Sequence, residues 1–214
     1  MRDNFQIKRA AISSELARFV MNYFLVKQMV HKTMTDFRYI SPYENAWGLH
    51  SDEQIPGTYC CYGDIAMETL LTYLEPVMEQ VAGKPILPTY SYARIYKKGD
   101  ELTRHKDRAS CEFSTTLNLG GDAWPIFVEP DASKGIIKNN QYIPSLSKGK
   151  KVELQPGDML IYRGCEVEHW REPFVGDQCV QVFLHYNIDS PEARKNIFDG
   201  RPHIGLPPWF KGKT

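Results

Sequence analysis

The sequence predicts a mainly β fold with a helical buttress, in the form of a helix-backed barrel or a two-sheet jelly roll. Two stretches before residue 84 carry apolar residues at the spacing of an amphipathic helix. From Pro88 onward the apolar period changes to two, and about seven or eight short strands separated by turn residues follow. Helices followed by a run of short strands favour helices packed on an antiparallel β structure.

Length and composition indicate one ordinary globular domain. The 214 residues suffice for a full core. We expect residues 1–87 to form helical N-terminal support, 88–187 the barrel and 188–214 a C-terminal tail. Lys and Arg (26) balance Asp and Glu (26) without a basic block, which argues against nucleic-acid or membrane-surface partners. Five cysteines without a framework spacing favour free thiols in a cytoplasmic protein.

The first ten residues carry no pattern, and the first helix is predicted after them. Ser13 or Ser14 can cap it, and it should end near Met34. Its expected apolar stripe is Leu16, Phe19, Val20, Tyr23, Val26 and Val30. Residues 36–62 contain Gly48, Pro56 and Gly57 and are predicted to be a long ordered connection.

The second helix is predicted between Asp64, a natural N-cap, and Gly83, a natural stop. Pro76 lies inside this pattern and should kink or shorten the helix. The apolar stripe consists of Met67, Leu70, Leu71, Leu74, Val77, Met78 and Val81. Both helices are expected to support a sheet.

The strands are predicted from Pro88 onward. In the first, Tyr90, Tyr92, Arg94 and Tyr96 share one face. Further strands are expected over residues 111–119, 125–128, 151–154, 159–163, around 169 and over 179–186, with residues 130–148 forming a surface loop. The tail is rich in Pro and Gly and should wrap the surface.

The short motif His105-Lys106-Asp107 is the candidate metal site. Side chains alternate along an extended segment, so His105 and Asp107 can reach one ion. Two imidazoles and one carboxylate form the facial triad of non-haem Fe(II) sites. His169 is favoured as the third ligand because it follows the turn and strand of residues 156–163, whereas the other histidines lack that setting (His31, His50, His185 and His203).

These parts resemble the Fe(II)/2-oxoglutarate-dependent dioxygenase superfamily, near its prolyl 4-hydroxylase-like branch. The matching segments are residues 94–99 (RIYKKG), 105–107 (HKD), 157–162 (GDMLIY) and His169, within a similarity over residues 88–187. The resemblance implies a double-stranded β-helix in which His105, Asp107 and His169 are metal ligands and catalytic residues. It implies Fe(II), 2-oxoglutarate and O2, with ascorbate as a candidate reductant. Tyr96 matches the tyrosine that hydrogen-bonds 2-oxoglutarate.

The sequence departs from the family at the residue that pairs the far carboxylate of 2-oxoglutarate. Members of the branch carry an Arg or Lys about ten residues after the distal His, where this chain has 177–181 (DQCVQ). A buried dicarboxylate still needs a cation. Arg171 is favoured because alternation points it to the same side as His169. Arg94, which shares a face with Tyr96, is the second choice or a helper, and Arg163 the third.

The expected activity is hydroxylation of an unactivated C–H bond in an amino acid, peptidyl or small-molecule substrate, with release of succinate and CO2. Aromatic residues at 90, 92, 124 and 170 are candidates for the mouth of the site. One alternative is a cupin-type barrel that binds a metal or small ligand without catalysis. Another is a zinc hydrolase with Glu166 or Glu168 as general base. The oligomeric state stays open.

Overall fold

The computed structural model describes residues 4–41, 43–50, 52–138 and 141–210, and two antiparallel sheets dominate this part of the chain. The six-stranded sheet has the order β1 (Phe5–Lys8), β10 (Met159–Tyr162), β5 (Phe113–Gly121), β12 (Gln178–Ile188), β3 (Ile86–Lys97) and β2 (Tyr59–Tyr62). The four-stranded sheet has the order β4 (Leu102–His105), β11 (His169–Arg171), β6 (Ile126–Val128) and β9 (Lys150–Val152). The predicted mainly β fold with antiparallel sheets is confirmed.

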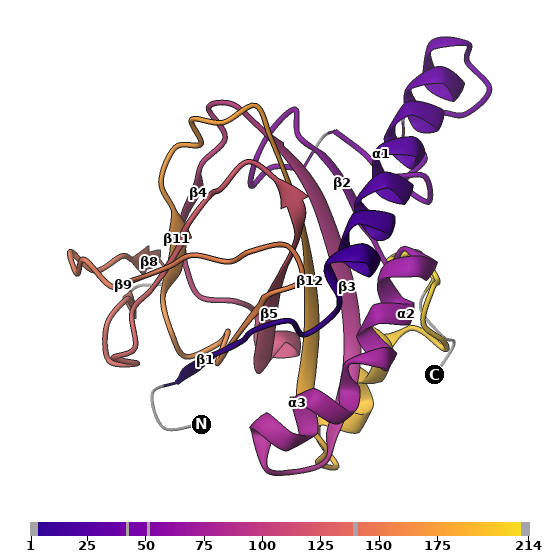
Figure 1. Cartoon of the computed structure of the whole chain (residues 1–214). Coiled ribbons are helices and arrows are strands. Elements are labelled where there is room, and N and C mark those ends of the chain that lie inside the picture. Colours follow the sequence, from indigo (N-terminus) through magenta and orange to yellow (C-terminus); the bar gives the residue numbers. More distant parts are fainter. Residues whose placement is uncertain (1–3, 42, 51, 139–140, 211–214) are drawn as a thin grey trace.

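Successive strands pass from one sheet to the other. Along the chain, β3, β5, β10 and β12 enter the larger sheet, and β4, β6, β9 and β11 enter the smaller one. Figure 1 shows the two sheets curving around a common interior. This interchange places the end of β4 and the start of β11 side by side, although their sequences are about sixty residues apart.

Four strands lie where the sequence predicted none. β1 falls within the first ten residues and extends the larger sheet through main-chain pairing with β10, and β2 ends the segment predicted as a connection. In the predicted loop 130–148, β7 (Ile136–Lys138) and β8 (Gln141–Ile143) form a hairpin with Ile136 opposite Ile143. Pairing to an edge or across a hairpin depends on a partner strand, which a local pattern does not reveal.

The first helix, α1 (Ser14–Asp36), begins where the cap predicted it, with Ser13 Oγ accepting from the Leu16 N–H. Its buried residues are Ala17, Val20, Phe24 and His31, of which the predicted stripe contained only Val20. Leu16 and Tyr23 of that stripe are partly buried against the core. Phe19 and Val26 are 70% and 57% exposed. Several stripes on α1 are apolar, so spacing alone did not identify the face that packs on the sheet.

The predicted second helix is two helices, α2 (Ile65–Tyr73) and α3 (Glu75–Ala82). Asp64 caps α2 by accepting from the N–H groups of Ala66 and Met67, and Gly83 ends α3 with a left-handed φ of 69°. The break falls at Leu74, which places Pro76 in the first turn of α3. There its missing N–H costs no helical hydrogen bond. The described residues before β3 therefore form three helices rather than two.

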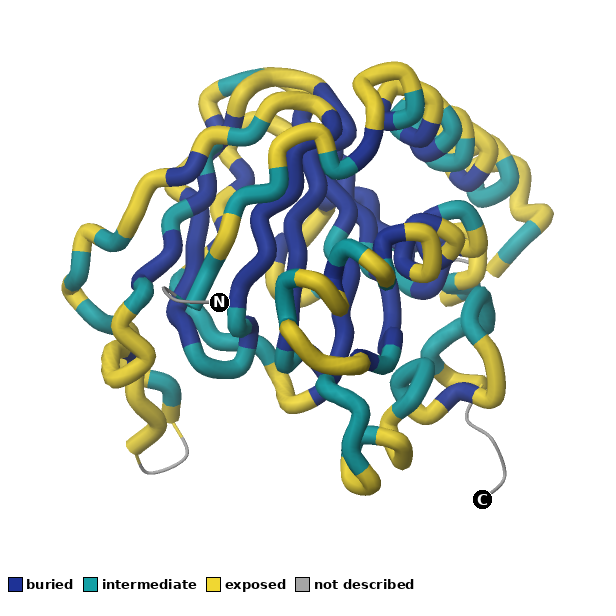
Figure 2. The backbone as a smooth tube through the Cα atoms, turned by 60° about the horizontal axis from the view of Figure 1, so that its bottom comes forward, coloured by how far each residue is buried: buried dark blue, intermediate teal, exposed yellow. Residues whose placement is uncertain are grey.

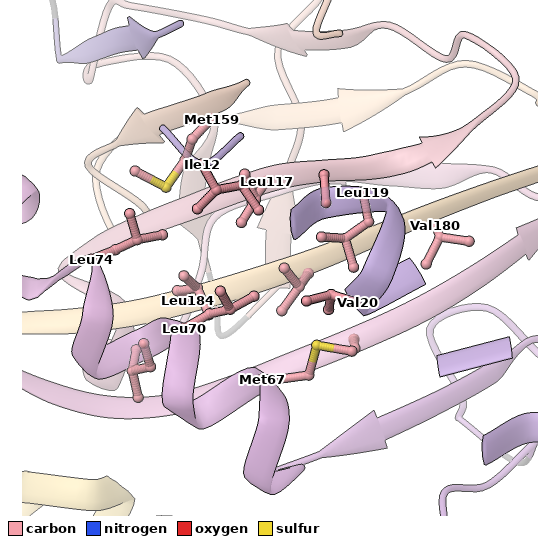
Figure 3. Close-up of a cluster of buried hydrophobic side chains, with 14 of the residues drawn as sticks. Ile12, Val20, Met67, Leu70, Leu74, Leu117, Leu119, Met159, Val180 and Leu184 are labelled. Carbon is pink, nitrogen blue, oxygen red and sulfur yellow. The ribbon is translucent and has the colours of Figure 1, made fainter. Parts of the chain in front are cut away.

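The main core lies between the helices and the larger sheet. Figure 3 shows the side chains of Met67 and Leu70 in α2, and of Leu74 just after it, directed toward strand residues such as Leu184. In Figure 2 the central strands are buried along most of their length, and the outer face of α1 is exposed. Apolar burial of this kind contributes roughly 25 cal/mol per Å². The helices thus fix the larger sheet from outside and leave its inner face free for the interior.

Asp158 ties the N-terminal segment to the sheet. Its carboxylate accepts from the backbone N–H of Ala10 at 2.9 Å and of Gln155 at 3.0 Å, and it pairs with Arg9 at 2.5 Å. Burial raises the pKa of Asp158, but these partners lower it below its ordinary value of 3.8. The stabilisation is therefore complete above pH 3.8 and is lost as the pH falls through the lowered pKa.

Replacing Asp158 by Ala should lower the free energy of unfolding by about 1–3 kcal/mol, because two backbone N–H groups lose their acceptor. Urea denaturation at pH 7 measures the change. The control is Glu153→Ala, which removes a 67%-exposed partner of Lys151 and should change stability by less than about 0.5 kcal/mol. Equal effects of the two variants would contradict the role given to Asp158.

The remaining segments complete the fold. A short 3-10 helix, η1 (Ala109–Cys111), precedes β5, and another, η2 (Ala193–Gly200), lies in the tail. Arg201 anchors the tail through a buried ion pair with Glu68 at 2.7 Å; residues 211–214 lie outside the described part.

All five cysteines are free, as predicted. No described helix is long and apolar enough to cross a membrane.

Candidate metal centre

The structure brings together the three residues predicted as metal ligands. β4 and β11 are antiparallel neighbours in which His105 is paired with His169, and Asp107 follows the end of β4. Asp107 Oδ1 lies 3.5 Å from His105 Nε2 and 3.4 Å from His169 Nε2. All three donor atoms lie within 4.8 Å of one another. This is the spacing that donors around one ion require.

Backbone carbonyls orient both imidazoles. His105 Nδ1 lies 2.7 Å from the Thr103 carbonyl oxygen, and His169 Nδ1 lies 3.1 Å from that of Val167. A carbonyl only accepts, so each Nδ1 carries the hydrogen and each Nε2 faces Asp107. Burial lowers the pKa of His105, but Asp107 raises it overall. A metal would replace the proton that Asp107 favours on His105.

The second oxygen of Asp107 is also fixed. Ser114 Oγ donates to Asp107 Oδ2 at 2.5 Å and lies 3.0 Å from His185 Nδ1. Burial lowers the pKa of His185 to about 4, so this imidazole is neutral and its Nδ1–H can donate to Ser114. Gly164 makes room for the arrangement, since a Cβ there would lie 2.5 Å from Asp107 Oδ2. These contacts hold the carboxylate with Oδ1 toward the imidazoles.

The charge of Asp107 is secured by its neighbours. Burial raises its pKa, but His169, His105 and His185 bring it well below the ordinary value. Asp107 is therefore an ionised ligand throughout the neutral range. A carboxylate with two Nε2 donors is a hard-to-borderline set that suits a divalent first-row metal.

A cavity of about 300 Å³ opens at this triad. Its wall includes the four residues of β3 that were predicted to share one face, which are Tyr90, Tyr92, Arg94 and Tyr96. Much of the remaining wall comes from three other parts of the chain: Phe183 and His185 of β12, Tyr162 of β10, and Asp52 and Gln54 of the segment before β2. The two other aromatic residues predicted for the mouth, Trp124 and Trp170, are not part of the cavity wall, and Trp170 stacks on Phe127 instead.

Three buried donors have no hydrogen-bond partner among the described residues. The Tyr96 hydroxyl and Arg94 Nε belong to residues of the cavity wall, whereas Arg171 Nε belongs to a residue outside it. Burial raises the pKa of Tyr96, whereas both arginines lower it, so each guanidinium acts on this one hydroxyl. Unpartnered buried donors are costly. A hydroxyl donor together with donors from two guanidinium groups is suited to binding an anion.

The three arginines predicted as carboxylate anchors differ in their partners. Arg171 is 1% exposed and lies outside the cavity wall. It donates to the Trp124 carbonyl and to Thr116 Oγ1 and forms no ion pair with any described carboxylate. Burial lowers its pKa. Arg94 lines the cavity and pairs with Asp52 at 2.9 Å. Arg163 pairs with Glu166 and lies outside the cavity wall.

The carboxylates considered for a zinc hydrolase do not lie at the metal centre. Glu168 is buried but receives hydrogen bonds from Tyr142 and Ser145 and pairs with Arg104 at 3.2 Å. Glu166 pairs with Arg163. Neither belongs to the cavity wall. No described Glu is thus placed as a general base beside the triad.

Asp52, Gln54, Ser114 and His185 are site residues that the sequence analysis did not identify. His185 could have been found, because alternation along 178–188 places it on the same face as Phe183. Ser114 lies opposite His185 in the pairing of β5 with β12, which requires knowledge of the register. Asp52 and Gln54 come from an irregular segment without a periodic pattern.

Several solved structures have a similar fold. A Pseudomonas putida prolyl-4-hydroxylase is 14% identical, with a TM-score of 0.52 over 87% of this chain and 93% of that one. HygX from Streptomyces hygroscopicus, solved with nickel and 2-oxoglutarate, is 11% identical, with a TM-score of 0.55 over 86% and 83%. The α-ketoglutarate-dependent carbocyclase SnoK of nogalamycin biosynthesis is 10% identical, with a TM-score of 0.59 over 96% and 92%.

No protein-family model and no curated protein matches the sequence. The similarity to solved structures therefore lies in the fold. That fold is the one of iron- and 2-oxoglutarate-dependent oxygenases, prolyl-4-hydroxylases among them, which confirms the resemblance drawn from the sequence at this level.

Proposed function

We propose that the protein is an Fe(II)- and 2-oxoglutarate-dependent oxygenase, built as a double-stranded β-helix over residues 88–187 within a single domain. The observation that carries the proposal is the convergence of His105 Nε2, His169 Nε2 and Asp107 Oδ1 at one cavity. The wall of that cavity also includes two buried donors without a partner, the Tyr96 hydroxyl and Arg94 Nε. Similar folds are described as a hydroxylase and a carbocyclase, and hydroxylation of a C–H bond is the reaction we favour here.

The residues present fit iron. His105, Asp107 and His169 supply a facial set that leaves three coordination positions for other ligands. The Thr103 and Val167 carbonyls fix the imidazoles, and Ser114 fixes the carboxylate, as outer partners of metal ligands commonly do. When bound, iron with 2-oxoglutarate and O2 supplies the oxidising power to break a C–H bond, with release of succinate and CO2.

The residues present also fit a dicarboxylate. An isolated buried guanidinium is destabilising unless an anion neutralises it, and Arg171 has only neutral acceptors. The hydroxyl of Tyr96 lacks a partner and lies within the field of Arg171 and Arg94. We infer that Arg171 and Tyr96 bind the far carboxylate of 2-oxoglutarate. Arg94 assists, because Asp52 already balances most of its charge.

The protein's own part in the reaction is orientation and exclusion of water. Asp107 stays ionised, both Nε2 atoms face the ion, and buried aromatic side chains of β3 and β10 limit solvent around it. A barrel that only binds a metal or an uncharged small ligand would have no use for a buried guanidinium without a carboxylate partner. This feature favours the oxygenase over the non-catalytic alternative.

Aerobic incubation with Fe(II) and 2-oxoglutarate labelled at the carboxyl next to the keto group tests the proposed activity. Labelled CO2 and unlabelled succinate should form in equal amounts, and only when iron, 2-oxoglutarate and O2 are all present. A panel of amino acids, peptides and small polar metabolites should contain compounds that raise the rate. Metal binding without any decarboxylation, with or without the panel, would contradict an oxygenase and favour the non-catalytic barrel.

A further inference from the structure

One side chain from outside the two sheets reaches the metal centre. Gln54 belongs to the segment between α1 and β2 and forms part of the cavity wall. Its Nε2 lies 3.5 Å from His105 Nε2, the imidazole nitrogen that faces Asp107. At this distance the contact is at the limit of a hydrogen bond. A proton or a metal on His105 Nε2 would remove it altogether.

Arg94 determines which end of the Gln54 amide faces the centre. Arg94 Nη1 lies 3.2 Å from Gln54 Oε1. A guanidinium only donates, so the amide oxygen must point to Arg94 and the NH2 group must point to the triad. Gln54 thus presents N–H donors toward the metal centre and has its acceptor already occupied.

The backbone around Gln54 is held in place by Asp52. Asp52 Oδ1 accepts from the N–H of Gln54 at 2.8 Å and of Ile55 at 3.3 Å, and it pairs with Arg94 at 2.9 Å. Its other oxygen accepts from the Tyr92 hydroxyl. Ile55 is buried against the cluster that contains Tyr96. Because both oxygens of Asp52 are occupied in this way, Asp52 positions the segment, and the side-chain NH2 group of Gln54 is the group available to a ligand.

We propose that Gln54 is a specificity-determining residue that donates an N–H to an acceptor oxygen of the substrate next to the reacting carbon. The substrate class that fits is a compound with a carbonyl, carboxylate or hydroxyl oxygen at that position, as opposed to a plain hydrocarbon or an ammonium group. In the metal-loaded protein His105 no longer accepts from Gln54, so its donor is available for this oxygen. This inference rests on the proposed function, since it requires a metal at His105, Asp107 and His169.

Two small probes of opposite hydrogen-bonding character test the direction of the Gln54 donor. The protein is loaded with Co(II) and 2-oxoglutarate, and azide or imidazole is titrated while the visible absorption of Co(II) is recorded. Azide remains an acceptor when bound, whereas imidazole presents an N–H at its far nitrogen. The variants are Gln54→Leu, which removes the donor at similar size, and Glu53→Gln, an exposed neighbour outside the cavity wall.

Gln54→Leu should weaken azide binding by about five- to tenfold, the value of roughly one hydrogen bond. Imidazole binding should be unchanged or slightly stronger, and Glu53→Gln should match the original protein with both probes. Unchanged azide affinity, or equal losses for azide and imidazole, would overturn the assignment of Gln54 alone. Failure of the unmodified protein to bind Co(II) would instead overturn the proposed function and this inference with it.

Discussion

Replacing His105, Asp107 or His169 by Ala should abolish iron-dependent turnover, with a loss of more than about 100-fold. Even outer partners of metal ligands are typically worth 10–100-fold in metal affinity or activity, and these three side chains are the proposed ligands themselves. The measurements are metal content after dialysis and the rate of succinate release. Each variant should lose metal together with activity.

Two further variants separate loss of a ligand from general damage. Ser114→Ala removes the hydroxyl that donates to Asp107 Oδ2. This variant should lower the rate of succinate release by about 10–100-fold while metal still binds. His203→Ala changes an exposed histidine of the tail and should have no effect. Substantial turnover in any of the three ligand variants would undo the assignment of the triad.

Replacing Arg171 by Ala should weaken 2-oxoglutarate binding by about 100- to 1,000-fold while metal binding persists. The size follows from the loss of one partner in a buried charge pair, which typically costs 3–5 kcal/mol. Calorimetric titration of the metal-loaded protein measures it. Arg171→Lys should recover part of the affinity for 2-oxoglutarate, because the positive charge remains but the bidentate hydrogen bonding to the carboxylate is lost.

Arg94→Ala is the matched comparison. Arg94 lies near the same tyrosine but is neutralised by Asp52, so its loss should weaken 2-oxoglutarate binding by less than about tenfold. If Arg94→Ala abolishes binding and Arg171→Ala does not, the anchor lies on β3 rather than β11. The difference between the two variants thus tests the choice made from their charge partners.

The sequence revealed those features of the fold and site that depend on local pattern. Alternation along residues 88–97 placed Tyr90, Tyr92, Arg94 and Tyr96 on one face, and the structure directs this face into the cavity. The H-x-D motif and His169 were found from residue type and spacing, and the strand pairing brings them together. Cap residues Ser13, Asp64 and Gly83 predicted helix ends because each satisfies or releases a backbone group at that position.

The features that the sequence did not reveal depend on contacts between distant segments. β1 exists because β10 offers an edge, and the exposed position of Phe19 follows from which side of α1 meets the sheet. Gln54 reaches His105 from an irregular segment held by Arg94, forty residues away. The unpartnered Nε of Arg171 is likewise a property of the folded interior. No local period encodes such contacts, so only the assembled structure displays them.

The most direct measurement of the central claim is an anaerobic titration of the metal-free protein with Fe(II) and 2-oxoglutarate, followed by visible absorption. The account predicts a weak charge-transfer band that needs both components, is absent in the His169→Ala variant, and requires a far higher 2-oxoglutarate concentration in Arg171→Ala. Bound iron with no band at any 2-oxoglutarate concentration would contradict the oxygenase assignment.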